Sequence, residues 1–269
     1  FDAKEDDILA LWTGLGFYRR AKNIFKTKEI IKKKYNNIFP EKFEELILLP
    51  GIGRSTAGAI MSIAYKKSYP ILDANVKRVI SRYGNLDLDK KDSVKNLWFL
   101  SELLTPEENI FEYTQGIMDL GATKCVLRNP SCEECPLVKS CQSAFKCFDL
   151  NKKNKKEKLR KKIFFTLAHS KDSFLLFKKN EKTFWESLWT PYDNRYKKKS
   201  NIFKEPFKSE TKIFNHSLSH IDLDITIEIF DYKRPFKLKT DLEHKWVNKN
   251  QIDKFGLPKP IKTIIENYV

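Results

Sequence analysis

The sequence has no apolar run of the roughly 18 or more residues that a membrane-crossing helix needs, and no signal peptide is visible. It has only five cysteines, and four of them fall between Cys125 and Cys141, which is wrong for a disulfide framework. These absences argue against membrane and secreted proteins. They favour a metal site in a reducing compartment, so we expect a cytoplasmic protein. The first residue is Phe1 rather than methionine, which predicts a processed chain or a fragment.

Positive charge, by contrast, is abundant. The 269 residues include 51 Lys and Arg against 35 Asp and Glu, which gives a formal net charge of +16. Such an excess favours a polyanionic partner, because Lys and Arg displace counterions from phosphate. The alternative is compositional drift toward Lys, Asn, Ile and Phe, as in an AT-rich genome. The two explanations carry similar weight, so charge alone does not identify the partner.

The sequence pattern divides the chain into three parts. Residues 1–147 carry apolar side chains at helical spacing. Residues 148–162 are dominated by Lys and Arg and predict a solvated linker, with a phosphate contact as an equal alternative. Residues 163–269 contain short apolar runs, strict alternation from Ile221 to Ile229 and a closing amphipathic helix, so they predict an α+β domain.

A glycine hairpin, Leu49–Gly53, lies between two helical patterns. Gly51 and Gly53 allow a tight turn and a close approach of the backbone to a ligand. The next helix is expected to begin near Arg54, which leaves its first N–H groups open to an anion. A helix–hairpin–helix that grips a DNA phosphate explains this arrangement, and an ordinary interhelical turn is the alternative.

Asp73 precedes a helical pattern that starts near Val76. A lone aspartate at this place usually caps the helix, and the helix dipole keeps a capping carboxylate ionised. An ionised carboxylate beside a flipped-out nucleotide could also stabilise the cationic sugar of glycosidic cleavage. The two roles are compatible.

Four cysteines, Cys125, Cys132, Cys135 and Cys141, form a Cys-x6-Cys-x2-Cys-x5-Cys loop. Zinc ribbons usually show two CxxC pairs, whereas this loop has one. Four thiolates in a compact loop suit a [4Fe–4S] cluster, which we favour over zinc. Cys147 lies outside this spacing.

An aromatic tract follows Trp12 in the segment WTGLGFYRRAKN. Base-flipping enzymes need a wedge that fills the vacated stack. Phe17 or Tyr18, on a glycine-containing loop backed by arginines, could be that wedge. Aromatic side chains in a corner of the core are the alternative.

The segments LPGIGRSTAGAI and PILDANVKRV and the cysteine spacing together resemble the endonuclease III superfamily of helix–hairpin–helix glycosylases. Within it, the chain is similar to the MutY-type adenine DNA glycosylases over nearly its whole length. The resemblance implies an all-α glycosylase domain with a [4Fe–4S] loop, followed by an α+β Nudix-like domain. It also implies a bacterial, nucleoid-associated monomer that removes adenine opposite 8-oxoguanine or guanine in duplex DNA, in base-excision repair.

The resemblance assigns roles to individual residues. It makes Asp73 the catalytic aspartate, Asn75 its neighbour near the sugar, and Gln115 a contact to the adenine edge. Ser55 stands where endonuclease III-like lyases carry the lysine that forms a Schiff base. A hydroxyl cannot form an imine, so we expect a monofunctional glycosylase that uses water.

The segment FNHSLSHIDLDI resembles the family's lesion-reading motif, with His216, Ser219 and His220 at its loop. No Nudix box is present, so this domain is expected to recognise a lesion without hydrolysing nucleotides. Leu218 and Phe17 depart from the family's usual Phe and Tyr.

Two alternatives remain. The family's general-acid glutamate belongs to a segment expected upstream of Phe1, so the chain could be a DNA-binding remnant without catalysis. An endonuclease III-like glycosylase–lyase is the other, against which Ser55 and the second domain argue.

Overall fold

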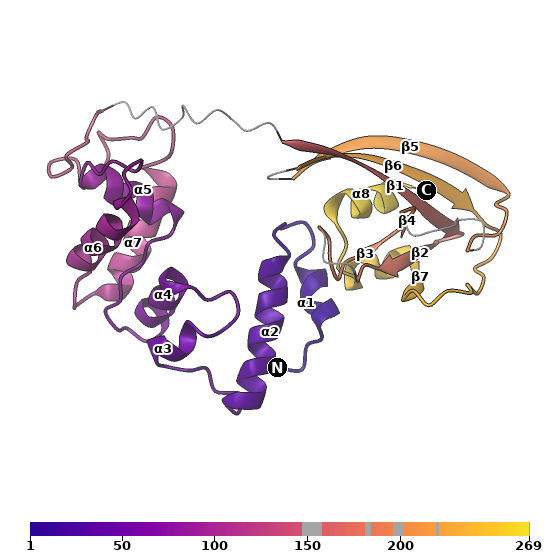
Figure 1. Cartoon of the computed structure of the whole chain (residues 1–269), viewed down its shortest axis with the longest axis horizontal. Coiled ribbons are helices and arrows are strands. Elements are labelled where there is room, and N and C mark those ends of the chain that lie inside the picture. Colours follow the sequence, from indigo (N-terminus) through magenta and orange to yellow (C-terminus); the bar gives the residue numbers. More distant parts are fainter. Residues whose placement is uncertain (147–157, 181–183, 196–201, 219–220, 269) are drawn as a thin grey trace. The chain divides into compact units, whose positions relative to one another are not determined.

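The computed structural model describes residues 1–146, 158–180, 184–195, 202–218 and 221–268. The chain folds into two compact units (Figure 1). The sheet unit comprises Phe1–Lys26 and Lys155–Val269, and the helical unit comprises Thr27–Asn154. The helices are α1 (Glu5–Leu11), α2 (Arg19–Lys34), α3 (Phe43–Leu46), α4 (Arg54–Ala64), α5 (Ala74–Tyr83), α6 (Ser93–Leu104), α7 (Ile110–Thr123) and α8 (Lys259–Asn267), with the 3-10 helix η2 (Lys249–Lys254).

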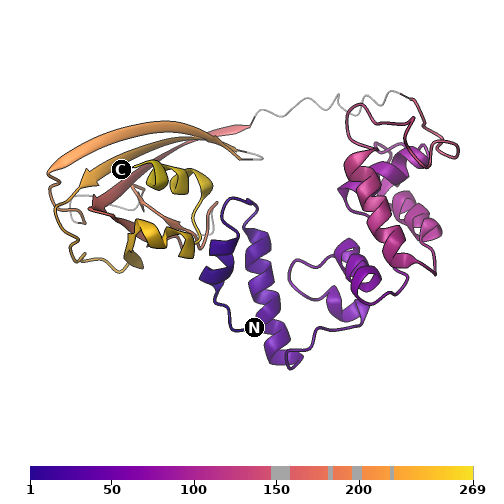
Figure 2. The same cartoon turned by 180° about the vertical axis from the view of Figure 1, so that it is seen from behind.

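The sheet unit is built on a mixed sheet, seen from both sides in Figures 1 and 2. Its strands are β1 (Leu159–Ser170), β2 (Ser173–Lys178), β3 (Trp189–Thr190), β4 (Tyr192–Asp193), β5 (Lys208–Ser217), β6 (Ile221–Asp231) and β7 (His244–Asn248). The strand order is β3-β2-β1-β6-β5, with β4 paired to β1 and β7 paired to β2. The central β1–β6 pair is parallel and the other pairs are antiparallel.

Alternation along β6 explains the core of this unit. Leu223, Ile225, Ile227 and Ile229 are fully buried, while the residues between them are only partly buried. The buried face packs against Ile261 of α8 in one apolar cluster. Because the side chains of a strand alternate between its two faces, this pattern fixes the register of the strand. The predicted strand and the predicted closing helix are both confirmed.

The helical unit contains two smaller cores. One joins α5, α6 and α7 through Val76, Leu97 and Ile117. The other joins α2, α3 and α4 through Ile31, Leu46 and Met61. Within the described part of the chain, no helix is long and apolar enough to cross a membrane.

Residues 1–26 pack with the strands rather than with the helices that follow them. Leu9 of α1 and Ala21 of α2 are fully buried in the same apolar cluster as the strand residues. The sequence-based division at 1–147, 148–162 and 163–269 follows the change from helical to strand periodicity. Periodicity does not indicate which core a helix packs into. Strand β1 also begins at Leu159, inside the segment predicted as a linker.

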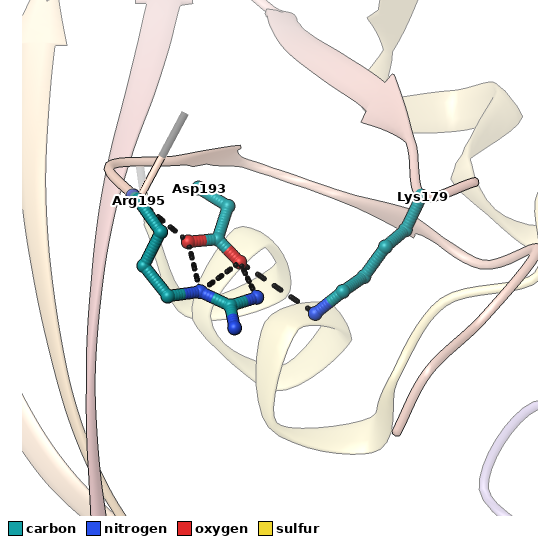
Figure 3. Close-up of polar contacts among 3 residues, drawn as sticks. All are labelled: Lys179, Asp193 and Arg195. Atoms are coloured by element: carbon teal, nitrogen blue, oxygen red, sulfur yellow. Dashed lines mark hydrogen bonds and ion pairs between the residues drawn. The ribbon is translucent and has the colours of Figure 1, made fainter. Parts of the chain in front are cut away.

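An ion group with a buried carboxylate is centred on Asp193 of β4 (Figure 3). The carboxylate of Asp193 accepts hydrogen bonds from Arg195 Nε at 2.9 Å and Nη2 at 2.6 Å, and Lys179 Nζ lies 3.6 Å away. Burial by itself raises the pKa of the Asp193 carboxyl. The hydrogen bonds from Arg195 and the two positive charges outweigh it, so that this pKa lies below its usual range.

Candidate active site and cysteine loop

The glycine hairpin connects the short α3 to α4. Gly51 has φ +83°, in the left-handed region where side chains are strained, and so the turn requires glycine. Gly53 is the N-cap of α4, and a Cβ added there would meet nothing within 4 Å. The backbone can therefore be approached closely at the start of α4, as an anion site requires.

Arg54 is held away from this turn by α6. Its guanidinium pairs with Glu102 and lies 3.9 Å from the ring centre of Trp98. The sequence did not indicate these partners. A phosphate contact by Arg54 stays a prediction, and it would compete with this pairing.

Asp73 is the N-cap of α5, and its Oδ1 accepts a hydrogen bond from the backbone N–H of Val76 at 2.7 Å. The residue is nonetheless exposed as a whole. The aspartate thus caps the helix while its carboxylate remains reachable from outside, so the structural and chemical roles can coexist.

Two residues of α4 hold the segment in front of Asp73. Ser55 Oγ accepts a hydrogen bond from the N–H of Leu72 at 2.9 Å. At Gly58, an added Cβ would lie 2.4 Å from the carbonyl oxygen of Pro70, so only glycine allows this contact. Ser55 therefore acts on the position of Asp73, and Gly58 is a site residue that sequence reasoning missed.

Asn75 is linked to the cysteine loop through Arg78. Arg78 Nη2 donates to Asn75 Oδ1 at 2.9 Å, and Arg78 Nε donates to the carbonyl of Cys125 at 2.7 Å. A Cβ at Gly121 of α7 would lie 2.7 Å from Asn75 Cβ, so the two helices meet closely. Sequence reasoning missed Arg78 and Gly121. Gln115 lies on α7 and is partly buried.

The four cysteines Cys125, Cys132, Cys135 and Cys141 line one cavity of about 30 Å³. Arg82, which is 4% exposed, closes one side: its Nη1 donates to Cys125 Sγ at 3.3 Å and to the carbonyl of Val126 at 2.7 Å. Among the described residues, no three His, Cys, Asp or Glu side chains converge closely enough to hold one metal ion. The structure therefore brings the four cysteines to one cavity, and the metal or cluster that they would hold stays a prediction.

The aromatic tract borders a second, larger cavity of about 920 Å³ inside the sheet unit. Phe17 is 69% exposed and has φ +47°, which is a strained conformation for a side-chain-bearing residue. Tyr18 differs, because burial raises the pKa of its hydroxyl despite a hydrogen bond from the Gly14 N–H. The hydroxyl donates to the carbonyl of Leu257 at 2.9 Å.

His216 and Leu218 also line this cavity. Burial and then the nearby charge of Lys259 lower the pKa of the His216 ring, which favours the neutral imidazole. The structure brings His216 and Leu218 to the same cavity as Phe17 and Tyr18. Ser219 and His220 lie outside the described residues.

Comparison with known proteins completes this description. Residues 1–101 match the model of the HhH-GPD superfamily base excision DNA repair proteins, and residues 163–267 match the NUDIX domain. An adenine DNA glycosylase of Buchnera aphidicola (subspecies Acyrthosiphon pisum) is 40% identical over 280 residues, which cover 99% of this chain and 80% of that protein. The chain belongs to the adenine DNA glycosylase family.

Some family members align over shorter spans. The human adenine DNA glycosylase is 33% identical over 144 residues, or 52% of this chain and 26% of that protein. Among solved structures, a thermostable thymine-DNA glycosylase is 30% identical with a TM-score of 0.47, covering 54% of this chain and 68% of that one.

Membership in the adenine DNA glycosylase family confirms the predicted family and the predicted fold of a helix–hairpin–helix part joined to a Nudix part. It also places the chain among the DNA N-glycosylases, which are hydrolases of N-glycosyl bonds. The roles predicted for single residues are not tested by it.

Proposed function

We propose that this chain excises adenine paired with 8-oxoguanine or guanine in duplex DNA, with Asp73 as the catalytic carboxylate. The proposal rests on one observation: Asp73 caps α5 and is nonetheless exposed. A fixed negative charge beside the sugar stabilises the positive charge that develops as the glycosidic bond breaks.

Ser55 supports hydrolysis over lyase chemistry. Its hydroxyl accepts the Leu72 N–H and so helps to fix the segment that ends at Asp73. A hydroxyl cannot form the imine through which a lyase works, so water is the nucleophile in this proposal. Asn75, held by Arg78, and Gln115 on α7 are proposed to contact the sugar and the adenine edge, respectively.

A [4Fe–4S] cluster is proposed for the cysteine loop. Its four thiols line one cavity. The loop has a single CxxC pair, whereas zinc ribbons usually have two, and four thiolates in a compact loop suit a [4Fe–4S] cluster. Arg82 and Lys124 add positive charge at the cavity wall, which suits four thiolates. The cluster would fold and hold the loop.

The cavity between Phe17 and His216 is proposed as the place where the partner base is read. It combines an exposed aromatic side chain, a neutral imidazole and the lysines Lys22, Lys26 and Lys259. Aromatic contact and phosphate attraction are two contributions that can hold a base and its backbone in place. Ser219 and His220 are proposed to complete this reader.

The test is Asp73→Asn in the protein expressed from its whole reading frame. The amide can still cap α5 but carries no charge, so base release should fall roughly 100-fold or more while DNA binding persists. Single-turnover release from an adenine:8-oxoguanine duplex, followed by alkaline cleavage, measures it. Activity within a few-fold of the unmutated protein would reduce Asp73 to a cap.

Borohydride trapping separates the proposal from the alternative enzyme. A lyase gives a covalent adduct with the DNA, whereas a monofunctional glycosylase gives none. Adduct formation by the unmutated protein would favour an endonuclease III-like glycosylase–lyase. Unchanged DNA binding without any base release would favour the non-catalytic remnant.

A further inference from the structure

The loop that carries Phe17 is attached to a residue near the other end of the chain. Leu257 is fully buried, and both of its backbone groups are engaged by side chains of this loop. Its N–H donates to Thr13 Oγ1 at 3.3 Å, and its carbonyl accepts from the Tyr18 hydroxyl at 2.9 Å. Two side chains thus act as hydrogen-bond partners for the N–H and the C=O of Leu257. Both groups would cost free energy if they were buried without a partner.

The same two hydroxyls also tie the loop to itself. Thr13 Oγ1 donates to the carbonyl of Leu9 at 3.3 Å, and the Tyr18 hydroxyl accepts from the Gly14 N–H at 3.3 Å. Trp12 Nε1 donates to the carbonyl of Gly16 at 3.0 Å. Phe17, like Leu15, stays exposed in this loop, and its backbone conformation must be imposed by its surroundings.

Apolar packing and two ion pairs secure the attachment. A Cβ added at Gly256 would lie 2.6 Å from Leu9 Cβ, so α1 packs directly on the backbone before Leu257. Asp6 pairs with Lys178 at 2.8 Å, and Lys22 pairs with Glu186 at 2.9 Å. The side chains of Asp6 and Lys178 are 30% and 16% exposed, so water only partly screens this pair.

We propose that Thr13 and Tyr18 are positioning residues, which fasten the Phe17 loop to Leu257 so that the wedge and the lesion-reading surface form one rigid piece. The proposal rests on the proposed function in one respect, that Phe17 enters the DNA. It differs from the sequence-based expectation for Tyr18, because the hydroxyl of this residue is used inside the protein and does not face a ligand.

The attachment itself is tested without DNA. A specific protease site is inserted between Lys146 and Lys158 of the full chain, and the cut protein is run on a sizing column. The two pieces should co-elute, because Leu9 and Ala21 of one piece are buried in the apolar core of the other. Leu9→Asp or Gly256→Ala should separate them, whereas Gly116→Ala should not, since a Cβ there meets nothing within 4 Å.

A charge swap guards against variants that merely misfold. Asp6→Lys and Lys178→Asp should each weaken the association of the cut pieces by roughly 2- to 5-fold, and the swapped pair should restore it. Pieces that separate without any substitution, or a swap that restores nothing, would overturn the attachment.

Positioning is tested with 2-aminopurine placed next to the adenine:8-oxoguanine pair, whose fluorescence rises when the stack opens. Thr13→Val and Tyr18→Phe keep the side-chain shapes but remove the hydroxyls. Each should lower the fluorescence rise toward that of Phe17→Ala and slow base release roughly 2- to 10-fold, because each hydroxyl makes two hydrogen bonds of modest net strength. DNA affinity measured on an undamaged duplex should stay unchanged.

Tyr65→Phe is the matched control, because its hydroxyl bonds the carbonyl of Pro40 at 3.3 Å within the helical unit. It should leave the fluorescence signal unaltered. If Thr13→Val and Tyr18→Phe behave like this control, the positioning role is wrong even when the cut pieces co-elute. If the unmutated protein gives no fluorescence rise, the proposed entry of Phe17 is wrong and the positioning role fails with it, while the co-elution result still stands.

Discussion

Arg82 in the helical unit and Arg195 in the sheet unit are both held by several hydrogen bonds, but their partners differ in kind. Arg195 grips the buried carboxylate of Asp193, with Lys179 on the other side (Figure 3). Arg82 donates to the carbonyls of Val126 and Leu127 and to a cysteine sulfur. Carbonyl dipoles orient a guanidinium without cancelling its charge.

The difference shows how each region reaches its final structure. Around Asp193, opposite charges meet within the polypeptide, so folding alone completes the group. Around the cysteine loop, Arg82 sets a positive charge beside four thiols that enclose a small space. The cluster proposed above would complete this loop. The two regions should therefore respond to different perturbations.

Loss of the cluster should have the largest effect, and only on the helical unit. Cys132→Ser should abolish iron binding and expose the amides of residues 124–146 to hydrogen exchange, because metal binding supplies on the order of 10 kcal/mol to such loops. Exchange in β1 and β6 should not change. Mass spectrometry of exchanged peptides, together with iron analysis, measures both.

Cys147→Ser is the matched control for the cysteine loop, since this residue lies outside the predicted ligand spacing. It should retain iron and the same exchange pattern. An iron-free protein with a fully protected loop would show that polypeptide contacts alone are sufficient there.

Asp193→Asn should be the most damaging substitution in the sheet unit. It removes the carboxylate that Lys179 and Arg195 share. Removing one partner of a buried ion pair lowers the free energy of unfolding by about 3–5 kcal/mol. Asp222→Asn, whose partner Lys158 is 3.7 Å away at the surface, should cost about 1 kcal/mol or less. Urea unfolding followed by tryptophan fluorescence compares them. Equal losses would mean that burial of the ion group has no consequence.

Arg78→Lys should have an intermediate effect that crosses from the loop to the proposed active site. Lysine cannot bond Asn75, Gly121 and Cys125 at once in the planar geometry that arginine offers. Base release should fall roughly 10- to 100-fold, as is typical for residues that orient a metal or active-site shell. Single-turnover kinetics with iron content measured in parallel would test it. Unchanged kinetics would show that the contact to Asn75 is incidental.

The smallest expected effect concerns pH and His216. Its folded-state pKa lies below the ordinary 6.5, so the unfolded chain binds a proton that the folded chain does not. Stability should therefore rise with pH between the folded-state pKa and 6.5. His216→Gln should flatten this slope in urea titrations from pH 5 to pH 8. An unaltered slope would assign it to other groups.

Local patterns in the sequence predicted several features correctly. The alternation along β6 follows from period-two burial, and the Asp73 cap follows from the residue types that open helices. The approach of the four cysteines to one another was predictable, because their spacing in the sequence limits how far apart they can lie in space. Each of these features depends on residues that are close in the sequence.

Features that depend on distant segments were not predictable in this way. Gly58 and Gly121 look like ordinary helical glycines, and only the close passage of Pro70 and Asn75 gives them a role. The helical pattern of residues 1–26 was read correctly, but no periodicity indicates which core a helix joins. The use of the Tyr18 hydroxyl required knowing that Leu257 lies beside it.

The bond between Tyr18 and Leu257 joins residues that are 239 positions apart, and this separation has a consequence for synthesis. At about 5–20 residues per second, a ribosome makes the later residue tens of seconds after the earlier one. During that time Leu9 and Ala21 have emerged without the strands and helix that bury them. We therefore expect chaperones to bind α1 and α2 on the nascent chain. A pause of the ribosome at rare codons before residue 250 should lengthen the time for which these apolar side chains are exposed.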